Sequence, residues 1–195
     1  MTASFRRFSG ACGILAGLSG LIYLVSFFIT RNPAALAPTL ALLAVGLLAG
    51  PLLVGLYEHL HSSDEGFARL GLLFGMGGAA GAAVHAAFDL SNNLHPPDAP
   101  FAYPSPIDPR GFLTFVAAGI SILLFARLIA ASGRLPRGLG ILGWVSGVVL
   151  ILLYLAYLIF LDPANPLILV LILASGILQP LWYLWAGWTF WNGKS

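Results

Sequence analysis

Long apolar runs are the feature that most constrains how this chain can fold. A helix needs about 20 consecutive apolar residues to cross the hydrocarbon core of a bilayer. Six segments reach that length, at residues 10–29, 38–57, 70–90, 111–131, 139–161 and 166–188. The runs are continuously apolar, without the alternation that membrane-spanning strands need. We therefore predict an all-α fold, a polytopic membrane protein whose 195 residues form a single six-transmembrane-helix bundle.

The composition supports this prediction and excludes several classes of protein. Charged residues make up 8% of the chain and the mean hydropathy is +0.93. A soluble domain carries roughly 25% charged residues, which it needs to cover its surface. A soluble enzyme and a nucleic-acid-binding protein are therefore excluded, and we expect membrane lipids as the surroundings of the chain. The single Cys12 allows no internal disulfide.

The placement of lysine and arginine indicates the orientation of the spans. An even number of spans puts both ends of the chain on one side of the membrane. The basic residues of that side are Arg6, Arg7, Arg69, Arg127, Arg134, Arg137 and Lys194, and those of the other side are Arg31 and Arg110. Because basic residues concentrate on the cytoplasmic side, we predict that both termini are cytoplasmic.

Small residues recur on one face of several spans. They are Gly10, Gly13, Gly17 and Gly20 in the first span, Gly71, Gly75, Gly78 and Ala82 in the third, and Gly140, Gly143 and Gly147 in the fifth. Small side chains allow helices in a membrane to approach closely. We expect these stripes to pack against other helices of the same chain. Self-association through the stripes, or contact with another membrane protein, is the alternative.

The third span carries the most informative polar pair. His85 and Asp89 are four residues apart and continue the face on which its small residues lie. Ionisable residues within a span are costly and are often functional. We therefore expect both side chains to point into the bundle, with His85 contacting Asp89 or a polar group of another span.

The loop after this span, predicted at residues 91–110, is rich in proline and contains His95 and Asp98. We expect it to form an extended cap on the outer face. If the cap folds over the bundle mouth, His95 and Asp98 join His85 and Asp89 in a ligand-binding site. Two histidines with a carboxylate suit zinc, which makes His85, Asp89 and His95 candidate metal ligands. A simple hydrogen-bonded His–Asp pair and a proton-sensing or substrate-binding pair are the alternatives, and no other cofactor is predicted.

Recognisable catalytic signatures are absent from the sequence. It has no P-loop, no His-Glu-x-x-His, no Cys-x-x-Cys and no Gly-x-Ser-x-Gly. We therefore assign no catalytic residue. The preferred function is non-catalytic: binding or passage of a small apolar or amphipathic molecule, or service as an accessory subunit. A metal-dependent membrane hydrolase with an outer-face site at His85 and Asp89 is the alternative.

One turn carries a resemblance to a known group of proteins. The chain reads Leu135-Pro136-Arg137-Gly138-Leu139-Gly140 as it enters the fifth span. With six spans, this length and an aromatic last span, it resembles a bacterial domain-of-unknown-function group of small integral membrane proteins. The resemblance implies a location in the bacterial inner membrane, and it carries no functional residues over.

Overall fold

The fold is an all-α bundle of membrane-spanning length. The computed structural model describes the whole chain except residues 31, 33–34, 97–109, 163 and 194–195. Its helices are α1 (Ala3–Thr30), α2 (Leu36–Leu60), α3 (Glu65–Leu94), the π-helix η1 (Phe112–Ala117) with α4 (Ala118–Ser132), α5 (Arg137–Phe160) and α6 (Pro166–Trp191). Counting η1 and α4 together, the described residues contain six helices long and apolar enough to cross a membrane. The predicted six-span bundle is confirmed.

Most helices extend beyond the apolar runs that predict them. The largest differences are at α1, which begins at Ala3, and at α3, which ends at Leu94. Hydropathy detects only the part of a helix that lies in hydrocarbon, whereas backbone hydrogen bonds continue into the polar layer. Local sequence then sets the ends: Asp64 accepts a hydrogen bond from the Phe67 amide at 3.1 Å and caps α3. The predicted loop at residues 91–110 therefore begins four residues too early.

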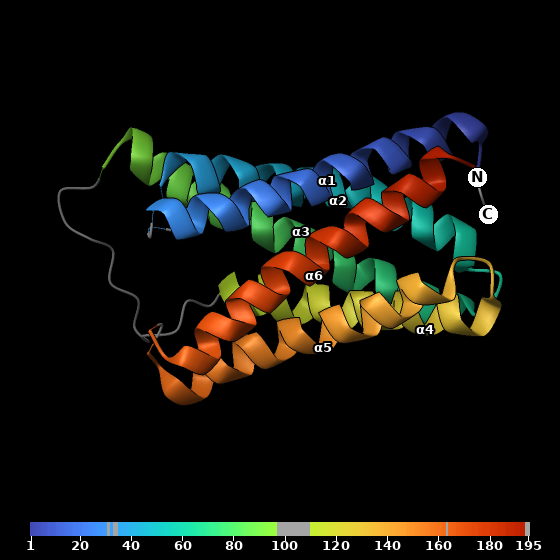
Figure 1. Ribbon diagram of the computed structural model, residues 1–195. Helices are drawn as coiled ribbons and strands as arrows, with labels where there is room; N and C mark the ends of the chain where they lie inside the picture. Colours follow the sequence, from blue (N-terminus) through green and yellow to red (C-terminus); the bar gives the residue numbers. More distant parts are fainter. Residues whose placement is uncertain (31, 33–34, 97–109, 163, 194–195) are drawn as a thin grey trace.

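The six helices form a closed ring in chain order. Each helix contacts the one before it and the one after it, and α6 returns to pack against α1 (Figure 1). Both termini lie at the same end of the bundle, as an even number of spans requires. We call the half that contains the termini the terminal half, and the opposite half, where α1 ends and α6 begins, the distal half.

Glycines bring α1 and α6 into backbone contact in the terminal half. A Cβ atom added to Gly187 would lie 2.6 Å from the carbonyl oxygen of Gly10 and from the amide nitrogen of Ile14. One added to Gly17 would lie 2.6 Å from the carbonyl oxygen of Pro180. The small residues of the first span therefore face another helix of the same chain, as expected.

The third span uses its small residues in the same way. A Cβ atom on Gly75 would lie 2.6 Å from Ser121 Oγ, and one on Gly78 would lie 2.9 Å from the backbone nitrogen of Ala118. Ser121 Oγ also donates a hydrogen bond to the carbonyl oxygen of Gly71 at 2.7 Å. This buried bond ties α4 to α3 beside these close contacts.

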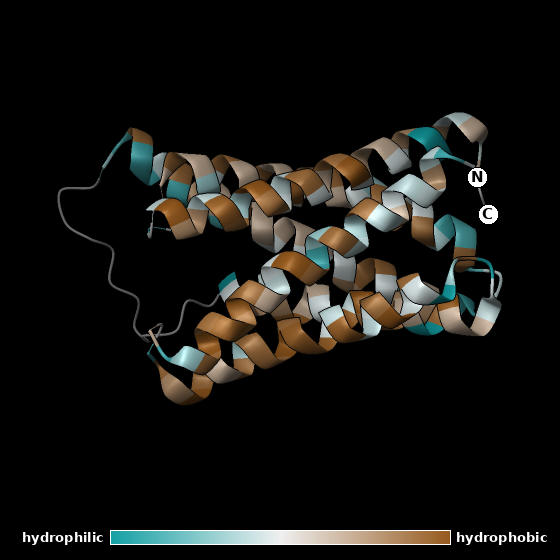
Figure 2. Cartoon of the chain, viewed as in Figure 1, coloured by the Kyte–Doolittle hydropathy of each residue, from teal (hydrophilic) through white to brown (hydrophobic). Residues whose placement is uncertain are grey.

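Large side chains fill the interior of the terminal half. The biggest fully buried ones include Trp182, Phe125, Phe190, Leu52, Leu56 and Leu139. Outside, large apolar residues such as Leu73 and Ile159 are exposed over more than 60% of their surface, which suits contact with lipid. Figure 2 shows hydrophobic residues along the helices and hydrophilic residues gathered toward the two ends of the bundle. The interior is thus closed on the side of the termini.

Candidate functional site

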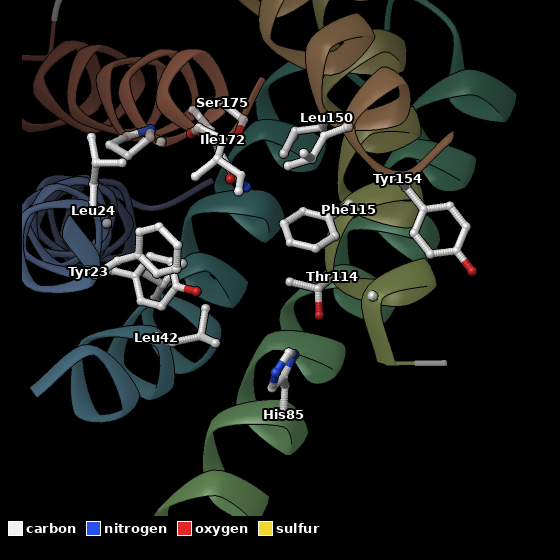
Figure 3. Close-up of a pocket in the computed structure, with 18 of the residues that line it drawn as sticks. Tyr23, Leu24, Leu42, His85, Thr114, Phe115, Leu150, Tyr154, Ile172 and Ser175 are labelled. Atoms are coloured by element: carbon white, nitrogen blue, oxygen red, sulfur yellow. Dashed lines mark hydrogen bonds between the residues drawn. The ribbon is translucent and has the colours of Figure 1, made fainter. Parts of the chain in front are cut away.

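The distal half of the ring surrounds a cavity of about 390 Å³. All six spans contribute to its wall, the fourth through η1 and the preceding Gly111. Most of the lining is apolar or aromatic, as in pockets that bind small molecules. Its lining residues include Tyr23, Phe27, Leu42, Val45, His85, Thr114, Phe115, Leu150, Tyr154, Tyr157, Ile172, Ser175 and Gln179 (Figure 3).

The cavity lies where α1 and α5, which are not neighbours in the ring, remain apart. Among the described residues, α1 and α5 share no backbone contact, although Tyr23 of α1 and Tyr157 of α5 both line the cavity. In the terminal half, Trp182 occupies the corresponding central space and is fully buried. The cavity therefore has a floor toward the termini, built over this packed core.

The wall from the fourth span begins as a π-helix. Phe112–Ala117 forms η1, and Thr114 and Phe115 within it line the cavity. Thr114 Oγ1 donates a hydrogen bond to the carbonyl oxygen of Arg110 at 3.0 Å. π-Helical turns are rare and occur frequently at functional sites, where the extra residue redirects side chains. Here the wider turn coincides with the segment that presents Phe115 to the cavity.

A charged cluster lies at the distal rim of the cavity. His85 Nε2 is 3.5 Å from Asp89 Oδ2, and Arg110 Nη1 is 3.4 Å from Asp89 Oδ1. The three side chains are only 21%, 13% and 18% exposed. Arg110 Nη1 also lies 3.4 Å from the carbonyl oxygen of His85, and its guanidinium stacks over the Phe88 ring at 4.6 Å. The cluster joins the end of α3 to the start of the fourth span.

The structure brings together two of the predicted site residues. His85 and Asp89 are in contact, as expected, and His85 also lines the cavity. His95 does not join them: it is exposed at the end of α3, about 15 Å along the helix from His85 at 1.5 Å per residue. Asp98 lies outside the described residues. The described part of the chain has no group of three His, Cys, Asp or Glu side chains that could hold a metal ion.

Arg110 is the partner that the sequence analysis missed. It was assigned to the loop, whereas it begins the helical segment that continues into η1. Its position directly before an apolar run was the available signal. The Arg110 guanidinium already contacts Asp89. A metal ion bound to the Asp89 carboxylate would therefore have to displace this guanidinium.

Gln179 is the second residue that the sequence analysis missed. It is the only glutamine of the chain, it lies in the middle of the last span beside Pro180, and it lines the cavity. Its Nε2 donates a hydrogen bond to the hydroxyl oxygen of Tyr183 at 3.3 Å. An isolated amide within an apolar run is a recognisable signal, because a polar group in a bilayer needs a partner inside the protein.

Comparison of the chain with protein families, with curated proteins and with solved structures finds no match. The resemblance to a bacterial group of small membrane proteins therefore stays a prediction. What the fold establishes is a multi-pass all-α membrane bundle with a hollow distal half.

Proposed function

We propose that this protein binds a small apolar or amphipathic molecule inside the membrane and has no catalytic activity of its own. The observation that carries the proposal is the cavity of about 390 Å³ in the centre of the ring. Pockets for small molecules have volumes of roughly 300–1,000 Å³, mostly apolar walls and a few polar groups that fix the orientation of the ligand. The cavity fits that description, with His85 and Gln179 among its few polar side chains.

Binding suits the cavity better than passage through the bundle. A pathway across the membrane would have to continue into the terminal half, where Trp182, Phe125 and Leu52 are fully buried against one another. The proposal is the same whether the chain works alone or as an accessory subunit of another membrane protein. The alternative of a metal-dependent hydrolase would require Asp89 to exchange Arg110 for a metal ion.

The orientation of the site follows from the basic residues. We place both termini in the cytoplasm of a bacterial cell and the protein in the inner membrane. The support is the excess of lysine and arginine on the side of the termini together with the resemblance of the turn before α5. In this orientation the distal half lies in the outer leaflet, and the rim formed by His85, Asp89 and Arg110 faces the exterior.

Native mass spectrometry of the protein released from mild detergent tests the proposal. We expect one co-purifying small molecule per chain, which solvent extraction then identifies. Leu42 lines the cavity and Leu40 is exposed two residues away on the same helix, so the pair gives a matched control. Leu42→Trp should reduce the bound molecule strongly and Leu40→Trp should leave it in place. Equal occupancy in the two variants, or no bound molecule in the wild-type protein, would contradict the proposal.

A second matched pair of substitutions, on α6, repeats the test in case a variant of α2 fails to fold. Ser175 lines the cavity from α6, whereas Val170 of the same helix is exposed. Ser175→Trp should displace the molecule and Val170→Trp should retain it. Circular dichroism of each variant confirms that the helices have formed before the occupancies are compared.

A further inference from the structure

The contact between α1 and α6 does not extend along the whole of α1. In the terminal half it is continuous, from Gly10 against Trp191 to Gly17 against Leu184. The glycine contact farthest toward the distal end joins Gly176 to Leu24, whose Cδ1 would lie 2.4 Å from a Cβ atom added to Gly176. Beyond this point the two helices diverge, α1 continuing beside α2 while α6 crosses toward α5 (Figure 1).

The cavity lies along this divergence. Its wall includes Tyr23 and Phe27 from α1 on one side and Ile172 and Ser175 from α6 on the other. Tyr23 of α1 and Ile172 of α6 border the cavity from the two helices (Figure 3), whereas Leu24 packs against Gly176 beside it. The seam between α1 and α6 is therefore also a boundary of the cavity.

Three other seams of the distal half are held by close packing. A Cβ atom on Gly81 of α3 would lie 2.5 Å from Leu113 Cβ of η1, and one on Gly46 of α2 would lie 2.8 Å from the carbonyl oxygen of Ala79. Ile168 of α6 is fully buried against α5. A molecule entering from the bilayer between α1 and α6 would therefore disturb less packing than one entering at any of these three seams.

The lining defines the chemistry of the molecule. Five aromatic side chains surround the space: Tyr23, Phe27, Phe115, Tyr154 and Tyr157. Flat rings pack well against such walls in offset or edge-to-face arrangements. Gln179, near the middle of α6, offers an amide donor to the cavity. Among the lining residues that the structure describes, His85 is the only one that could carry a positive charge. Its neighbours Asp89 and Arg110 balance each other, so the lining favours a neutral ligand.

The geometry points to a neutral, ring-bearing lipophile of the quinone type as the occupant, entering from the bilayer between α1 and α6. A ring carbonyl accepts a hydrogen bond from Gln179, the ring lies among the aromatic side chains, and an attached tail leaves through the seam into the lipid. This inference rests on the proposed function and adds the class of ligand and its route. The volume of about 390 Å³ holds a ring system but cannot enclose a two-chain phospholipid.

Equilibrium binding to the protein in lipid nanodiscs tests the inference, with empty nanodiscs as the blank. Three probes are compared. The first is menadione, a methylated naphthoquinone. The second is the same ring carrying a long isoprenoid tail, and the third is decanoic acid. We expect both quinones to bind saturably and decanoic acid not to bind. Binding of menadione without binding of the tailed quinone would overturn the lateral route. Saturable binding of decanoic acid alone would overturn the ligand class and leave the proposed function intact.

The role of Gln179 is tested with the same probes. Gln179→Leu should weaken menadione binding about tenfold, the effect of losing one buried hydrogen bond, while Ile177→Leu on the exposed face of α6 should leave it unchanged. Equal menadione binding by the two variants would overturn the proposed hydrogen bond between Gln179 and the ring carbonyl. If no probe binds and no small molecule co-purifies with the chain, the proposed function falls together with this inference.

Discussion

The guanidinium of Arg110 and the carboxylate of Asp89 meet at 3.4 Å at the distal rim of the cavity, across a sequence separation of 21 residues. Both side chains are less than a fifth exposed. Charged side chains that are this sheltered, beside a membrane, are stable when they are paired. An isolated charge there would lose its hydration without compensation. The pair therefore fixes the start of the fourth span against the end of α3 and sets the shape of the cavity mouth.

Removal of Arg110 should destabilise the protein. Arg110→Ala leaves the Asp89 carboxylate sheltered without its guanidinium, at an expected cost of about 1–3 kcal/mol. Thermal unfolding in detergent measures the change. The exposed pair of Glu65 and Arg69 is the control, since both side chains are more than 60% exposed. Arg69→Ala should cost at most about 0.5 kcal/mol, and equal effects of the two variants would show that the rim pair is solvated.

Two adjacent glycines of α3 should respond in opposite directions to alanine. A Cβ atom on Gly77 meets nothing within 4 Å, whereas one on Gly78 lies 2.9 Å from the backbone nitrogen of Ala118. Gly78→Ala should destabilise the bundle by about 1–3 kcal/mol through overpacking. Gly77→Ala should stabilise it slightly, by up to about 1 kcal/mol, because alanine favours helix. Thermal unfolding that ranks the two variants in the reverse order would contradict the packing of α3 on the fourth span.

Zinc should not occupy the rim. Arg110 already contacts Asp89, and His95 lies far along α3 from His85. We expect the purified protein to bind no stoichiometric zinc in elemental analysis after incubation with the metal and desalting. One zinc per chain that disappears in the His85→Ala variant would contradict this expectation and favour the hydrolase alternative.

Reporter fusions should place the two ends of the bundle on opposite sides of the membrane. Ser63 and Ser132 lie near the ends of helices in the terminal half, and Asn165 lies just before α6 in the distal half. Fusions at Ser63 and Ser132 should give a cytoplasmic signal, and one at Asn165 an external signal. The opposite pattern would reverse the orientation and move the cavity to the inner leaflet.

The fold could be predicted because each span is recognisable from its own stretch of sequence. Apolar runs of membrane length predict six helices, and the small residues of α1 and α3 predict close packing of those helices. His85 and Asp89 could be predicted as an inward pair because their spacing continues the small face of α3. The end of α3 at Leu94 could not be read from hydropathy, since polar residues extend the helix beyond the apolar core.

The cavity could not be predicted because it depends on which helix faces meet. Tyr23, Phe115 and Gln179 come from three helices that are far apart in the sequence, and no periodicity within one helix relates them. These residues come together because α6 packs against α1 in the terminal half and separates from α1 beyond Leu24. Gln179 alone carried a local signal, as a single amide in an apolar run.

A density map of the protein in lipid nanodiscs, prepared from membranes without added ligand, tests the central claim most directly. We predict density for one small molecule in the distal half, bounded by Tyr23, Phe115 and Gln179, with α1 and α6 apart beyond Leu24. A cavity closed by contact of α1 with α6 up to Thr30, or filled by the protein's own side chains, would contradict the claim that the distal half is a binding site.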